Sequence, residues 1–139
     1  MKMRYLIFPA LITLFLLLAM ASFQRVSDRN YAWDYSINHA RSVILGCQLY
    51  RKHSESGGNF PATLNELLEA RFKGQEYLEV PEIDILDWQG KRLRYALLIN
   101  EQGEQEVYVW TEITVREKTQ LCGAKGTIDG SVTLFGLPE

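Results

Sequence analysis

Cysteine is nearly absent from the sequence: its 139 residues include only Cys47 and Cys122, and no Cys-x-x-Cys pair. A thioredoxin-type redox motif is therefore excluded. Basic residues are not in excess either, since the formal net charge is −2 and, from Arg25 onward, 13 basic residues stand against 17 acidic ones. Because proteins bind nucleic acid through clustered Lys and Arg, we expect no nucleic-acid partner.

Short catalytic motifs are also missing. No serine stands in a nucleophile-elbow pattern, and the stretch 123–127 lacks the Gly-Lys-Thr order of a phosphate loop. His39 and His53 are 14 residues apart, which is about 21 Å along a helix, so they cannot share one metal ion. We interpret both as solvated surface histidines, and we expect that the protein is not an enzyme.

Charge is missing from one long stretch, since residues 5–23 carry none. At about 1.5 Å per residue this apolar run spans roughly 28 Å as a helix, close to the hydrocarbon thickness of a bilayer. Lys2 and Arg4 precede it, and Ala19-Met20-Ala21 is a small-x-small site for signal peptidase. Residues 1–24 are therefore a membrane anchor or a cleaved signal peptide. The anchor is favoured because the run exceeds the ~7–15 residues of a signal h-region.

The basic flank predicts the side of the membrane on which the remaining residues, 25–139, lie. By the positive-inside rule, these residues face away from the cytoplasm. In a bacterium this predicts a single-pass inner-membrane protein with its domain in the periplasm; a cleaved signal predicts a periplasmic or secreted protein. In that oxidising compartment we expect a disulfide between Cys47 and Cys122, with two buried free thiols as the alternative.

Between Asp28 and Ser54 the apolar residues recur at helical spacing, and Gly57-Gly58 ends the pattern. The predicted stripe consists of Trp33, Ile37, Ala40, Val43, Ile44, Cys47 and Tyr50. Thr63-x-x-Glu66 is a capping box for a short helix that reaches about Phe72. An acidic linker, Glu76 to Asp87, follows it.

After Gly90 the period of the apolar residues changes to two, which is typical of strands. Residues 93–99 and 107–113 predict a hairpin with one apolar face, and Asp129-Gly130 predicts a two-residue type I′ turn in a second hairpin. The helix stripe most economically covers the apolar face of the sheet. We therefore expect an α+β fold: a long N-terminal helix, membrane plus amphipathic, packed on a small antiparallel sheet of about four strands.

Stretches of residues 40–136 resemble pilin-like proteins, in particular the major pseudopilin of type II secretion. Gly58-Asn59-Phe60-Pro61-Ala62, after the helix end at 49–53, is similar to the family's connection out of its long helix. Asp87-Trp88-Gln89-Gly90-Lys91 is similar to its entry into the sheet, and Ile128-Asp129-Gly130-Ser131-Val132 to its end hairpin. The resemblance implies that residues 25–139 form a pilin-like domain of a membrane-anchored structural or assembly protein, with protein partners in a secretion or envelope system.

The resemblance also implies two expectations about sites. Residues 1–24 contain no Gly and no Glu, so the motif at which prepilins are cut is missing, and we expect no processing by prepilin peptidase. The family's major pseudopilin binds calcium in a loop near its sheet, for which Glu82, Asp84 and Asp87 are the candidate ligands here; a solvated acidic loop without a metal is favoured. No other cofactor is expected.

A second function class stays open. A secreted or periplasmic module that binds a glycan or a peptide would use exposed aromatic side chains, provided that they lie in a groove rather than in the core. The candidates are Tyr31, Trp33, Tyr35, Trp88 and Trp110.

Overall fold

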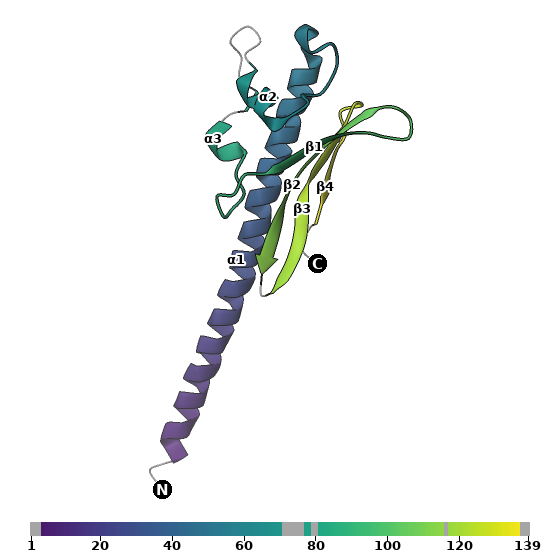
Figure 1. The fold of residues 1–139 in the computed structure, drawn as a ribbon. Coiled ribbons are helices and arrows are strands. Elements are labelled where there is room, and N and C mark those ends of the chain that lie inside the picture. Colours follow the sequence, from purple (N-terminus) through teal and green to yellow (C-terminus); the bar gives the residue numbers. More distant parts are fainter. Residues whose placement is uncertain (1–3, 71–76, 79–80, 116, 137–139) are drawn as a thin grey trace. The chain divides into compact units, whose positions relative to one another are not determined.

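The computed structural model describes residues 4–70, 77–78, 81–115 and 117–136, and Figure 1 shows its fold. The chain divides into two compact units, Met1–Tyr31 and Ala32–Glu139. Helix α1 runs from Arg4 to Lys52 and contributes residues to both units. All other elements that the structure describes belong to the second unit.

Within the second unit, burial along α1 is periodic. All seven residues of the predicted stripe are buried, each at most 6% exposed: Trp33, Ile37, Ala40, Val43, Ile44, Cys47 and Tyr50. The amphipathic helix is therefore confirmed. It is followed by the 3₁₀ turn η1, Ser54–Ser56. Gly57 and Gly58 then adopt φ values of 65° and 80°, left-handed conformations that keep the chain from continuing as a helix.

Helix α2, Leu64–Glu69, begins where the capping box predicted it. The Thr63 side chain accepts a hydrogen bond from the Glu66 N–H, and the Glu66 carboxylate accepts one from the Ala62 N–H. The helix ends one residue before its C-cap, Ala70, and is shorter than predicted. The predicted end near Phe72 lies outside the described residues.

The predicted acidic linker contains a helix that the sequence pattern did not predict. This helix, α3, spans Pro81–Asp84. One turn of helix is too short to show a 3.6-residue period, so the pattern carried no signal for it.

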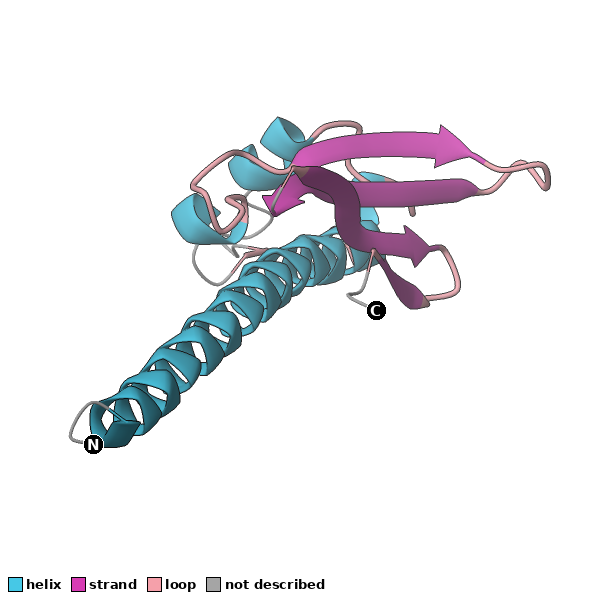
Figure 2. Cartoon of the chain, turned by 90° about the horizontal axis from the view of Figure 1, so that it is seen from below, coloured by secondary structure: helices cyan, strands magenta, loops and turns pink. Residues whose placement is uncertain are grey.

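The sheet has four strands in the order β1-β2-β3-β4, and each strand is antiparallel to the next (Figure 2). The strands are β1 (Arg94–Ile99), β2 (Gln105–Val115), β3 (Lys118–Thr127) and β4 (Val132–Phe135). The sheet is open, with β1 and β4 at its two edges. The prediction of a small antiparallel sheet of about four strands is confirmed.

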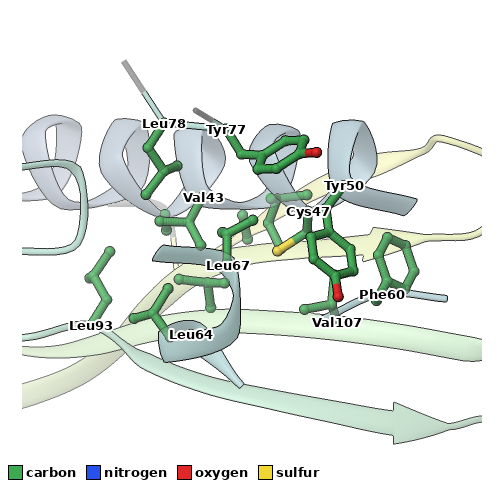
Figure 3. Packing of buried hydrophobic residues seen from close by; sticks show 14 residues of the cluster. Val43, Cys47, Tyr50, Phe60, Leu64, Leu67, Tyr77, Leu78, Leu93 and Val107 are labelled. Atoms are coloured by element: carbon green, nitrogen blue, oxygen red, sulfur yellow. The ribbon is translucent and has the colours of Figure 1, made fainter. Parts of the chain in front are cut away.

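One face of the sheet packs on α1. On β2 the side chains that face the helix are Val107, Val109, Thr111 and Ile113, none more than 5% exposed. Much of the core is a single cluster of residues from α1, α2, the sheet and the segments that connect them, including the ten labelled in Figure 3. A smaller cluster joins Ala32, Trp33 and Ile37 to Ile113 and Cys122. A helix layer on one face of an antiparallel sheet is the α+β arrangement that the sequence predicts.

The β3–β4 turn differs from the prediction. The Thr127 N–H donates to the Ser131 carbonyl, and the Gly130 N–H donates to the Thr127 carbonyl. Gly130 has a φ of 91°, but Asp129 is not among the residues with positive φ. The loop therefore has three residues, a type I turn followed by a glycine bulge, and the type I′ prediction is wrong because that turn needs positive φ at both central residues.

Strand β3 was not predicted as a long strand, because its glycines and polar residues weaken the β pattern. Gly126 explains one of these interruptions. A Cβ atom at this position would lie 2.7 Å from Ile44 Cγ2 and 3.1 Å from Val107 Cγ1. The absent side chain therefore lets α1 approach the sheet closely.

Candidate functional site

The apolar part of α1 in the first unit has no buried face among the side chains that the structure describes. From Leu11 to Phe23 every side chain is exposed. By length and composition, α1 is the one helix of the described residues that could cross a membrane. Such an exposed apolar surface is stable in a bilayer or in a signal-sequence receptor but not in water. The segment is therefore suited to be a membrane anchor or a signal sequence.

The two cysteines do not form the predicted disulfide. Both are free and buried. Cys47 lies in the larger core cluster, whereas Cys122 packs with Ile37 in the smaller one. Cys47 lies ten positions after Ile37, which corresponds to about 15 Å of helix, while a disulfide needs Cα atoms about 4.4–6.8 Å apart. The two sulfur atoms therefore serve as small apolar groups in separate parts of the core.

Burial also makes Cys122 a poor nucleophile. Desolvation, with a smaller contribution from the charge of Asp87, raises the pKa of the Cys122 thiol from 9.0 to about 11. A thiol with such a pKa is protonated at neutral pH, and the thiolate is the reactive form.

The three calcium candidates have different surroundings. Glu82 is exposed and Asp84 is half-buried, both in α3, whereas Asp87 is 2% exposed. Within the described ranges, no group of three or more His, Cys, Asp and Glu side chains is placed to hold a metal ion. Calcium binding by these residues stays a prediction of the sequence alone.

Asp87 organises the entry into the sheet. Its Oδ1 accepts hydrogen bonds from the N–H groups of Gln89 and Lys91, each 2.9 Å long. Its Oδ2 accepts a buried hydrogen bond of 2.6 Å from Thr111 Oγ1 on β2. The carboxyl group thereby ties the turn before β1 to the middle of the sheet, a role that the sequence does not reveal because Thr111 is 24 residues away.

The histidines are not the solvated surface residues that we predicted, because both are half-buried. His39 Nδ1 lies 2.8 Å from the Leu86 carbonyl oxygen, and its ring packs on Tyr35 with centroids 4.0 Å apart. The His53 ring meets Tyr77 edge-on, with centroids 6.4 Å apart. His39 therefore joins α1, and His53 the residue just after α1, to a neighbouring segment of the second unit.

The candidate glycan-binding aromatics do not share one environment. Trp33 is a core residue at 6% exposure. Tyr31 and Trp88 are exposed, whereas Tyr35 and Trp110 are half-buried. Trp110 points away from α1, beside Tyr108 on the outer face of β2.

The outer face of the sheet, which α1 does not cover, carries paired charges around these aromatics. Lys125 Nζ lies 2.9 Å from Glu106 Oε1, and Arg94 Nη1 lies 3.0 Å from Glu112 Oε1. The hydrogen bond from Lys125 lowers the pKa of the Glu106 carboxyl group, with Tyr108 contributing a second donor. The charges of these four side chains are thus paired on this face.

Comparisons with protein-family models, with curated proteins and with solved structures found no match to this chain. The chain can be described by its class: an α+β domain whose long helix continues an apolar segment. The exposed features that the described residues offer are that segment, the outer sheet face and the edge strands.

Proposed function

We propose that this protein is a membrane-anchored, pseudopilin-like structural or assembly component of a secretion or envelope system, and that it acts through protein–protein contacts. One observation carries the proposal: α1 has a charge-free stretch with every side chain exposed from Leu11 to Phe23, and an amphipathic stretch packed on a sheet from Ala32 onward. A helix of this composition joins a membrane segment to a folded domain without a linker.

The stretches that resemble the pilin family support the proposal through their roles in the fold. Phe60, which is 3% exposed, follows the end of α1 and packs in the core. The Tyr95 hydroxyl on β1 donates to the Pro61 carbonyl. The second stretch begins at Asp87, the residue that holds the turn before β1. These residues therefore hold the connections between elements in place.

The proposal places the anchor in a bacterial inner membrane with the domain in the periplasm. Lys2 and Arg4 support this orientation through the positive-inside rule. The protein partners are other components of the same assembly, and the membrane is the common surface on which they meet.

Fractionation and N-terminal sequencing test the anchor. The full-length chain should stay in the membrane pellet through carbonate washing and should keep its own N-terminus. After extraction in mild detergent it should migrate in a complex larger than one chain. As a control, residues 1–24 are exchanged for an unrelated cleavable signal peptide, which should release a soluble domain from the membrane and from the complex. A native soluble form that begins at Ser22 would instead support the secreted binding module.

Prepilin peptidase distinguishes this protein from a pilin subunit. Residues 1–24 lack both the Gly and the Glu of the cleavage motif, so coexpression with such a peptidase should leave the N-terminus unchanged. A known prepilin in the same cells is the positive control. A mass loss at the N-terminus of this chain would show that the peptidase accepts it, and the proposal would then change to a processed filament subunit.

A further inference from the structure

The β3–β4 turn contains a chemically labile pair of residues. Asp129 is the one Asp or Asn in the sequence that a glycine follows, and none is followed by a serine. In such a pair the backbone nitrogen of the second residue can attack the side-chain carboxyl carbon of the first. Glycine has no Cβ atom to hinder this attack. Asp129 and Gly130 are both exposed, so water reaches them.

The reaction changes the path of the main chain and uses no reagent except water. The Gly130 nitrogen forms a bond to Cγ of Asp129, while the carboxyl OH and the amide hydrogen leave together as water. A second water molecule then opens the five-membered imide. Opening at the side-chain carbonyl restores aspartate. Opening at the main-chain carbonyl gives isoaspartate, in which the chain runs through the former side chain and is one methylene longer.

The folded turn engages both of the reacting groups. The Gly130 N–H donates to the Thr127 carbonyl oxygen, 3.1 Å away. The Asp129 Oδ1 atom accepts hydrogen bonds from the Thr127 hydroxyl and from the Ser131 N–H, the latter 2.8 Å long. These bonds must break before the nitrogen can attack the carboxyl group, so the folded turn is less reactive than a free chain.

The charge of Asp129 acts in the same direction. The imide forms from the neutral carboxyl group, because water is a far better leaving group than an oxide ion. Hydrogen bonds from Thr127 and Ser131 lower the pKa of Asp129 from 3.8 to about 2. The neutral form is therefore rarer at neutral pH in the folded chain than in the unfolded one.

Two side chains of α1 hold the same turn. Gln48 Nε2 donates to the Thr127 carbonyl oxygen at 2.7 Å, and Arg51 Nη2 donates to the Ile128 carbonyl oxygen. Gln48 and Arg51 are three residues apart, so they are neighbours on one face of the helix. Two consecutive carbonyl groups before Asp129 are thereby bound to the end of α1, which restricts rearrangement of the turn.

We propose that Asp129–Gly130 is a site of isoaspartate formation, and that the native turn, held by Gln48 and Arg51, suppresses the reaction. Isoaspartate then accumulates only in chains whose turn has opened. The additional methylene does not fit a turn that the Thr127 N–H closes on the Ser131 carbonyl, so β4 loses its register with β3. The modification thus marks chains that have been unfolded, and it does not depend on the proposed assembly role.

Ageing of the full-length chain in mild detergent at neutral pH tests the proposal. Electron-transfer fragmentation of the peptide that contains position 129 measures isoaspartate, which has the same mass as aspartate. The native chain should form it about tenfold more slowly than the same chain in guanidinium chloride, since the hydrogen bonds of both reacting groups must break first. In guanidinium chloride, Gly130→Ala should slow the formation severalfold, which assigns the product to this bond.

Two substitutions test the hold on the turn. Arg51→Met keeps an apolar stem but cannot donate to the turn carbonyl, so the native chain should form isoaspartate about threefold faster. Thr127→Val removes the hydroxyl that donates to Asp129 and should have a similar effect.

Thr111→Val is the matched control for these variants. It loses a buried hydrogen bond to Asp87 but lies away from the β3–β4 turn, opposite Cys122. Its rate of isoaspartate formation should stay near that of the native chain. The control therefore separates local opening of the turn from a general loss of stability.

Three results would overturn the proposal. The first is an equal rate of isoaspartate formation in the native and the denatured chain. The second is a denatured chain that forms no isoaspartate at position 129. The third is a rate in Arg51→Met and Thr127→Val that does not exceed the rate in Thr111→Val.

Discussion

At the scale of single residues, Ile44 marks a close approach of the helix to the sheet. It is fully buried, and its Cγ2 atom occupies space that a side chain at Gly126 would need. The sequence identifies Ile44 as the centre of the apolar stripe, but it does not identify Gly126 as its counterpart. In the sequence alone, a glycine only weakens the prediction of a strand. Its role in letting the helix approach becomes clear once the residue that packs against it is known.

Replacing Ile44 by aspartate tests this contact. Ile44→Asp places a carboxylate in the core without a partner, so it should cost several kcal/mol, a large part of the stability of a small domain. Arg41→Asp is the control, because Arg41 is exposed on the same helix and its replacement should change stability little. Thermal unfolding of the full chain in detergent measures both. An unchanged midpoint for Ile44→Asp would mean that α1 is not packed on the sheet.

Thr111 is a second residue whose role depends on a distant partner. Its hydroxyl donates to the buried Oδ2 atom of Asp87. Thr111→Val keeps the shape of the side chain but leaves that oxygen without its donor, so it should cost about 1–3 kcal/mol. Thr114→Val, at an exposed position on the same strand, should cost much less. Similar unfolding midpoints for the two variants would show that the Asp87 bond does not stabilise the fold.

At the scale of elements, patterns that repeat within one segment and the hairpin between the neighbouring segments 93–99 and 107–113 were predictable, whereas particular contacts between distant segments were not. The α1 stripe and the alternation on β2 depend only on period, and both were correct. The length of β3 was missed because Gly123 and Gly126 interrupt the alternation, although β2 pairs with β3 from Glu106 to Val115. The disulfide was expected from compartment alone, and the separation of the two cysteines in the fold could not be read from their spacing.

The β3–β4 turn gives a prediction about pH. Hydrogen bonds from the Thr127 hydroxyl and from Ser131 lower the pKa of Asp129 from 3.8 to about 2. A carboxyl group with a lowered pKa in the folded state contributes stability above its unfolded pKa, and loses it as pH falls through the folded value. Asp129→Ala should therefore lower the thermal midpoint at pH 6, and its difference from the native chain should shrink between about pH 4 and pH 2.

The matched control for that titration is Glu104→Ala, at the end of the other turn that uses a type I geometry and a glycine bulge. Glu104 bonds to Asn100 only through its backbone. Because the Glu104 side chain makes neither of these bonds, Glu104→Ala should change the thermal midpoint little at pH 6. A midpoint difference for Asp129→Ala that stays constant down to pH 2 would mean that the charge of Asp129 does not hold the turn.

At the scale of the whole molecule, the chain separates its apolar residues into two uses. The apolar residues between Leu11 and Phe23 are all exposed, and both buried clusters consist of residues from Ala32 onward. The charge is divided in the same way. Residues 5–23 carry none, whereas residues 25–139 contain 17 acidic and 13 basic residues. An acidic domain with its own apolar core and a separate uncharged segment are the features that suit a domain tethered to a membrane.

This division predicts how the chain behaves without its first residues. A fragment of residues 25–139 keeps every member of both clusters, so it should fold, stay soluble and unfold within a few degrees of the full-length chain in detergent, since it loses no buried contact. Differential scanning calorimetry of both proteins measures this. A fragment of residues 41–139, which lacks Trp33, Ile37 and Ala40, is the control and should be clearly destabilised because Ile113 and Cys122 lose their cover. If the 25–139 fragment were as unstable as the shorter one, the apolar segment would be part of the domain's core, and the separation of tether and domain would be wrong.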